Sequence, residues 1–141
     1  MKYYIKLENE NQYDPVIILN EVECSEEFIT DFEYKLKSLD HDSVERGTAR
    51  PEFIIKGKII PEIYKQLTMI SDWSFKKKEL YMFMTIACID TSSGQPVICR
   101  KFDFDSVFCV DYGEKYNGEE KSFELIMAQS PLGLKREVVT G

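Results

Sequence analysis

The sequence has little of what most enzymes and metal proteins need. It contains a single histidine, His41, and none of its four cysteines stands in a Cys-x-x-Cys pair. Only one imidazole is therefore available, whether as the base of a nucleophile or as a zinc ligand. There is no glycine-rich phosphate loop and no Gly-x-Gly-x-x-Gly motif. We expect no catalytic residue, no cofactor-binding residue and no metal ligand in this chain.

Positive charge and long apolar runs are also scarce. Lys and Arg number 18 against 25 Asp and Glu, which gives the 141 residues a formal net charge of −7. Such a chain repels a phosphate backbone, so we expect no nucleic acid as a partner. No apolar run approaches the ~20 residues of a membrane helix, and the first residues lack the apolar core of a signal peptide. We expect a protein made in the cytoplasm, without a membrane partner.

The cysteines and the histidine have simple interpretations. Cys24, Cys88, Cys99 and Cys109 each lie in a strand-like run, which favours buried, reduced thiols over zinc ligands or disulfides. His41 stands between two aspartates in a polar segment, and one imidazole on an exposed loop makes a poor metal site. A solvated histidine is the simpler interpretation.

What the chain does have is alternation of apolar and polar residues, which is typical of half-buried strands. The predicted strands cover residues 3–7, 16–24, 26–36, 52–60, 79–90, 95–112, the stretch that ends at 129, and about 133–139. Asn117-Gly118 predicts the turn of a hairpin within residues 101–129. Gly57 interrupts its strand, which indicates a bulge or a close approach of another backbone.

One segment has helical periodicity. Pro61 suits the first helical position, and Ile63, Leu67 and Ile70 recur at spacings of four and three. We predict one short α-helix at about 61–71, which covers an open end of a barrel. The fold class is therefore mainly β, an antiparallel β-barrel of two packed sheets with that helix, in a single domain spanning residues 1–141.

Strand 79–90 is apolar on both sides. Alternation places two sets of side chains on opposite sides of this strand. One set is Tyr81, Phe83, Ala87 and Ile89, and the other is Met82, Met84, Ile86 and Cys88. The helix or a second sheet could cover the outer side. Alternatively that side packs on another copy of the protein, because large apolar patches rarely stay exposed on monomers. We expect Met82, Met84 and Ile86 to form this interface between copies.

The order of these elements resembles that of a known family. The residues that carry the resemblance are VERGTARPEFIIKGKI, IPEIYKQLTMISDW and KFDFDSVFCVDYGEKYNGEEKSFELIMAQS. They look like the loop-to-strand passage, the helix and the C-terminal hairpin of the type VI secretion tube proteins, the haemolysin-coregulated protein family (Hcp, or TssD). The resemblance covers about residues 16–139.

The resemblance implies an architecture and a function. In that family a barrel capped by a helix forms six-membered rings, and the rings stack into a tube. A contractile sheath expels the tube with a spike at its tip, so sheath and spike proteins would be partners, effectors would be cargo and the subunit would be secreted. Phage tail-tube proteins share the barrel, so a phage-type tail tube or a tube adaptor fits too. A small non-catalytic β-barrel that binds a partner protein or a ligand remains the alternative.

Charge is unevenly spread along the chain. Between Glu8 and Glu33 there are nine acidic residues and no Lys or Arg, whereas residues 35–58 carry six basic ones. Opposite charge on separate segments suits a head-to-tail ring, in which each subunit presents two complementary surfaces. A solvated surface on which charges cluster explains the same pattern.

The polar loop from Lys37 to Pro51 is the predicted connector between stacked rings. It carries almost no apolar residue, and loops of this length usually have a function. Arg46, Gly47 and Arg50 are the residues that we expect to contact the next ring, because an arginine pairs well with carboxylates.

Overall fold

The computed structural model describes residues 1–10, 16–37, 50–75, 81–130 and, for the backbone alone, 135–139. Its elements are β1 (Lys2–Asn9), β2 (Ile17–Asn20), β3 (Ile29–Lys37), β4 (Arg50–Lys58), a 3-10 turn η1 (Pro61–Ile63), α2 (Tyr64–Phe75), β5 (Met82–Asp90), β6 (Val97–Asn117), β7 (Glu120–Gln129) and β8 (Lys135–Val139). The predicted mainly β fold with one short helix is confirmed. The helical segment continues to Phe75 because Trp73 adds a further turn of buried side chains.

The predicted second strand is shorter than the alternation suggested. It ends at Asn20, where the backbone N–H of Val22 donates a hydrogen bond to the side chain of Asn20 over 3.0 Å. An asparagine that bonds the backbone two residues ahead forms a turn and so stops a strand. The segment after Asn20 therefore leaves the sheet.

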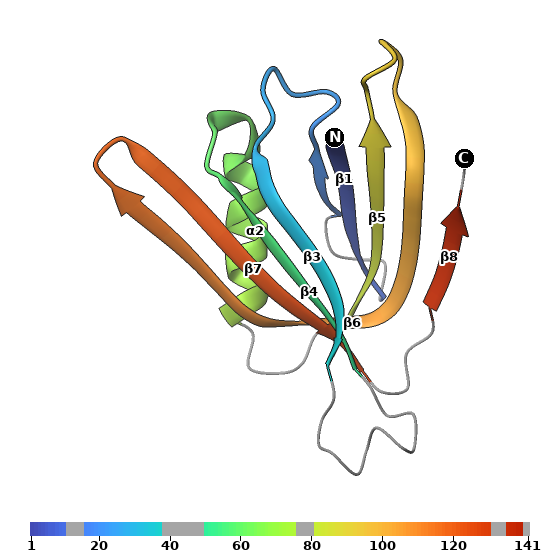
Figure 1. Cartoon of the computed structure of the whole chain (residues 1–141). Helices are drawn as coiled ribbons and strands as arrows, with labels where there is room; N and C mark the ends of the chain where they lie inside the picture. Colours follow the sequence, from blue (N-terminus) through green and yellow to red (C-terminus); the bar gives the residue numbers. More distant parts are fainter. Residues whose placement is uncertain (11–15, 38–49, 76–80, 131–134, 140–141) are drawn as a thin grey trace.

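The strands pair antiparallel in the order β2-β1-β5-β6-β7-β4-β3, and β8 also pairs with β6. β6 joins the two halves of this order, because its first part pairs with β5 and its last part with β7. The pairing skips two residues between Phe104 and Val107, and Ser106 there has a φ of 55°. Figure 1 shows β6 curving at its base from one layer into the other. The path is open, with β2 and β3 at its two ends.

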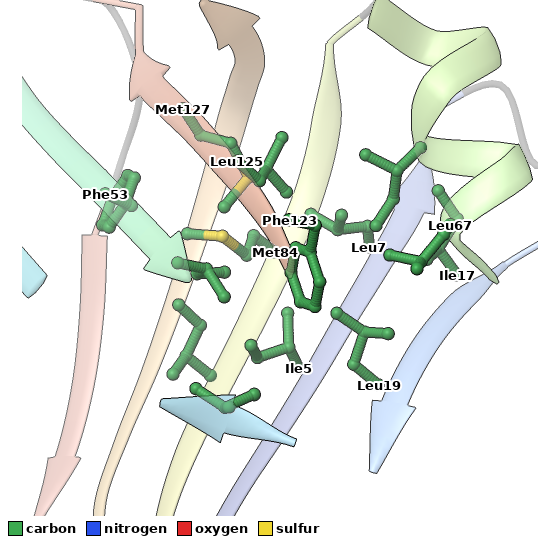
Figure 2. Packing of buried hydrophobic residues seen from close by; sticks show 14 of the residues in the cluster. Ile5, Leu7, Ile17, Leu19, Phe53, Leu67, Met84, Phe123, Leu125 and Met127 are labelled. Carbon is green, nitrogen blue, oxygen red and sulfur yellow. The ribbon is translucent and has the colours of Figure 1, made fainter. Parts of the chain in front are cut away.

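The inner faces of the two layers and one side of α2 enclose a single hydrophobic core. The helix contributes Leu67, Ile70 and Trp73. The labelled strand residues in Figure 2 lie together in this cluster, among them Leu7, Met84 and Leu125. Fully burying an aliphatic side chain of this size contributes about 1.5–3 kcal/mol. The core therefore holds the two layers together.

A buried carboxylate joins the ends of the open path. Glu21, just after β2, is fully buried and accepts hydrogen bonds from the backbone N–H groups of Tyr3 and Phe28, each over 2.9 Å, and of Ile29. Burial raises the pKa of Glu21, although the three hydrogen bonds act in the opposite direction. The Tyr3 ring also stacks on Phe32 of β3, with 5.9 Å between ring centroids. We call this group of contacts the Glu21 clamp.

Gly57 in β4 is the close approach that the sequence indicated. A Cβ atom at this position would touch the carbonyl oxygen of Phe28 and lie 2.7 Å from the Phe123 ring. The pairing of β3 with β4 is also irregular here, between Ile29 and Asp31. A glycine is therefore required for β3 and the Phe123 ring to pack against β4.

Gly57→Ala should lower the free energy of unfolding by about 1–3 kcal/mol, because the new methyl group overpacks a site bounded by backbone and an aromatic ring. Urea denaturation measures the change. Gly113→Ala is the matched control, since a Cβ on that glycine meets no atom within 4 Å. Equal losses in the two variants would contradict this account of Gly57.

Candidate assembly surfaces

The residues predicted as the ring interface lie in the core of the single chain, and that prediction is wrong. Met82, Met84 and Ile86 are 4%, 1% and 0% exposed. In the sheet, Met84 lies opposite Leu7, and Ile86 lies opposite Ile5. These side chains are already covered by their own chain and cannot pack on another copy.

The other side of β5 is the outward one. Thr85 lies between Lys6 of β1 and Asp103 of β6, and its hydroxyl donates a hydrogen bond to the Asp103 carboxylate over 2.7 Å. This row of three polar residues marks the face that meets water. The sequence contained one indication of which side of β5 faces outward: Thr85 is the polar residue on the side that also carries Phe83 and Ala87.

A groove crosses this outward face and has a volume of about 520 Å³. Ala87 and Ile89 form an apolar floor, and both are buried although they face outward. Ile98 lines one part of the groove, and Lys6 and Lys101 line it as well. We call this site the outer groove.

Large apolar side chains remain exposed in and around the outer groove. Val22 and Ile98 line it, and the sheet register places Ile18 and Phe83 on the same outward face. Clusters of exposed apolar residues on a soluble domain usually mark a surface that another molecule covers. The outer groove is therefore the stronger candidate for an interface between copies.

The predicted stacking residues are only partly within the described part of the chain. Arg46 and Gly47 lie outside the described residues. Arg50 is the first residue of β4 and pairs with Lys37 of β3, so it belongs to the sheet instead of the loop. Its guanidinium carbon lies 5.8 Å from the centre of the Phe108 ring.

The uneven charge of the sequence is partly neutralised within the chain. Lys35 and Lys37 both lie within 4 Å of the Glu52 carboxylate, at 3.8 and 3.9 Å. Lys56 lies 3.4 Å from Glu124. The Lys56–Glu124 pair is exposed at both ends, and a surface pair of this kind is worth about 1 kcal/mol or less. Three of the six basic residues of this segment therefore have acidic partners within the chain.

The four cysteines are free thiols, and each is partly buried. Burial raises the pKa of Cys24 and Cys88, and it raises the pKa of Cys109 to about 11. Thiols of this kind are protonated at neutral pH and react slowly. Within the ranges that the structure describes, no group of three or more His, Cys, Asp or Glu side chains could hold a metal ion.

The arrangement of the strands matches solved structures along nearly the whole chain. The superposition with Hcp3 from Pseudomonas aeruginosa has a TM-score of 0.59 and covers 99% of this chain and 97% of that one. A further Hcp crystal structure gives 0.57, with 98% of each chain covered. The chain has an Hcp-like tube fold. The sequence resemblance to this family is thus confirmed at the level of the fold.

A third structure with a similar fold comes from a different assembly. The baseplate of the anti-feeding prophage contains a chain that superposes with a TM-score of 0.58 and covers 98% of this chain and 93% of its own. Identities to these three structures are only 8–9%. No protein-family model and no curated protein matches the sequence. Similarity at this level shows the fold alone.

Among the described residues, no helix is both long and apolar enough to cross a membrane. α2 has 12 residues and buries one side against the core. Its exposed side carries polar residues such as Lys65 and Thr68.

Alkylation tests the description of the thiols. At pH 7.5 we expect Cys109 in the native protein to react with iodoacetamide at least about tenfold more slowly than in guanidinium, because its raised pKa leaves little thiolate. Peptide mass spectrometry of timed samples measures the rate at each cysteine. Four modified thiols should appear after denaturation without reductant. Equal rates for Cys109 in the two states would contradict its burial.

Proposed function

We propose that this chain is a non-catalytic, structural subunit of the inner tube of a contractile injection apparatus of the type VI secretion kind. The observation that carries the proposal is the match to Hcp structures over 98–99% of the chain. The building unit is the single domain of residues 1–141. Six copies close into a ring, and rings stack into a tube.

The proposal includes the partners of such a tube. Sheath and spike proteins of the apparatus surround and cap it, and effectors travel as its cargo. The subunit is made in the cytoplasm and leaves the cell through the apparatus. Neither nucleic acid nor a membrane takes part, which fits the net charge of −7.

A non-catalytic role is supported by the chemistry of the surface. The single histidine has no partner cysteine nearby in the sequence, and three of the four thiols have a raised pKa. Polar side chains such as those of Glu21 and Thr85 form hydrogen bonds within the fold.

The ring interface that we now propose is the outer groove with its exposed apolar neighbours. A stable interface buries about 1,000 Å² or more, which an extended sheet face can supply. In a ring this surface must meet a different surface of the next copy. Arg46 and Gly47, together with Arg50 at the start of β4, stay our proposal for the contact between stacked rings.

A phage-type tail tube or a tube adaptor is the second candidate. The specific observation in its favour is the similarity to a chain of the anti-feeding prophage baseplate, which is as strong as the similarity to the Hcp structures. An adaptor would form one ring and would not continue into a tube. Electron microscopy of the purified protein at high concentration separates rings from tubes.

Native mass spectrometry tests the ring. We expect a species of six times the chain mass of 16.5 kDa at micromolar concentration. Phe83→Glu should shift it to monomers, because Phe83 is exposed beside the outer groove and a buried, unpaired charge is costly at an interface. Val110→Glu, an exposed position on β6, is the control.

The outcomes of that test have separate meanings. Wild type that stays monomeric at high micromolar concentration contradicts the proposed function. Rings of Phe83→Glu as stable as those of wild type contradict the outer groove as the interface. Melting curves show whether both variants keep the fold, and surface substitutions normally change stability by only about 0.5 kcal/mol.

The double variant Arg46→Glu with Arg50→Glu tests the stacking contact. We expect rings to persist while tubes become fewer, because the reversed charges repel carboxylates on the next ring. Counts of tubes in electron micrographs, at matched concentration, measure the effect. Tubes as frequent as in wild type would show that this loop is not the connector.

A further inference from the structure

A second surface lies between the β6–β7 hairpin and the start of α2. Tyr112, Glu114 and Tyr116 alternate on one face of β6, where Tyr112 also packs against the core. Both tyrosine hydroxyls donate to the Glu114 carboxylate: Tyr112 to Oε2 over 2.8 Å and Tyr116 to Oε1 over 2.5 Å. The carboxylate is therefore held in a fixed orientation by two rings of the same strand.

The helix completes this site. Tyr64 and Thr68 of α2, with Leu67 and Ile59 as an apolar floor, line a cavity of about 360 Å³ together with Glu114 and Tyr116. Figure 1 shows the β6–β7 hairpin extending alongside α2. We call this site the tyrosine notch.

The Glu114 carboxylate of the notch has no cationic partner among the described residues. Glu114 forms no ion pair with any side chain in the described part of the chain, although Lys121 lines the same cavity. Burial raises the pKa of Tyr112, and the hydrogen bond to Glu114 raises the pKa of Tyr116. The hydroxyls are therefore neutral donors at physiological pH.

The aromatic rings of the notch are unusually accessible. Tyr116 is 62% exposed and Tyr64 is 47% exposed. A ring face attracts a cation within about 6 Å of its centre, and Arg is the residue most often found there. A planar guanidinium can stack on a ring and donate to a carboxylate at once, which a compact ammonium does less well.

We propose that the tyrosine notch binds the guanidinium group of an arginine side chain of a partner protein. The carboxylate of Glu114 accepts hydrogen bonds from the guanidinium, and the exposed rings of Tyr64 and Tyr116 flank it. One carboxylate is too few to hold a metal ion, and the negative charge excludes an anion. The notch is complete within one copy, so the inference goes beyond the tube proposal and does not require a ring.

The surroundings favour a basic partner. A neighbouring groove of about 700 Å³ begins at Tyr64 and is lined by Glu26, Glu119 and Glu120, with Lys58 and Lys121 as its two cations. Carboxylates thus outnumber ammonium groups at this end of the molecule. A partner segment that carries arginine and further positive charge would be steered there.

A peptide titration tests this inference. The probe is acetyl-Gly-Arg-Gly-amide, and the matched control is the same peptide with neutral citrulline in place of arginine. Ring resonances of the tyrosines, followed by NMR, should shift and saturate with the arginine peptide at millimolar concentrations. Glu114→Gln should weaken this binding by about tenfold or more, because the charged acceptor is lost. Glu33→Gln, on β3 and outside the lining of both cavities, should leave it unchanged.

A second variant guards against a change of fold. Tyr116→Leu removes an exposed ring and should also weaken binding, while the amide spectrum away from the notch stays as in wild type. Equal binding of the citrulline peptide, binding unaffected by Glu114→Gln, or no saturation by the arginine peptide would each overturn the proposal. Failure here leaves the mass of the native ring unaffected, so the two proposals fail separately.

Discussion

The fold depends on a carboxylate that holds the two ends of an open sheet together. Glu21 follows the end strand β2, and its side chain accepts hydrogen bonds from the backbone N–H groups of Tyr3 in β1 and of Phe28 and Ile29 at the start of the other end strand, β3. Without it, the two buried N–H groups of Phe28 and Ile29 would lose this acceptor, at about 1–3 kcal/mol each. Because the clamp fixes β1 relative to β3, it also fixes the layer that carries the outer groove. Acidic residues usually lie on the surface, whereas Glu21 is buried and stabilises the core through these hydrogen bonds.

The periodicity of the sequence predicted the strands, but it did not predict which side of each strand is buried. Alternation indicated the strands and the two apolar sides of β5, and the break at Gly57 indicated a close approach. Period two says which residues share a side, but not which side is inside. That choice depended on pairing with β1, where Lys6 meets Thr85 and Leu7 meets Met84. Similarly, nothing in a run of acidic residues marked Glu21 as the buried one.

The assembly surfaces follow from the same packing. With Met84 in the core, the exposed apolar residues lie on the other side of β5, beside the outer groove. The tyrosine notch lies elsewhere, between α2 and the β6–β7 hairpin. A subunit that joins copies and also meets other proteins needs separate surfaces for the two tasks. This chain presents one apolar surface and one charged, aromatic surface, which suits that division.

The central claim is that this Hcp-like chain builds a ring through the outer groove. Cryo-electron microscopy of the purified particle tests it most directly, because a map shows both the symmetry and the surface that each copy buries. The account predicts six copies, with Phe83 and Ile98 covered by the neighbouring copy and Met84 enclosed within its own. A map in which Phe83 and Ile98 face solvent, or in which no closed ring exists, would contradict it.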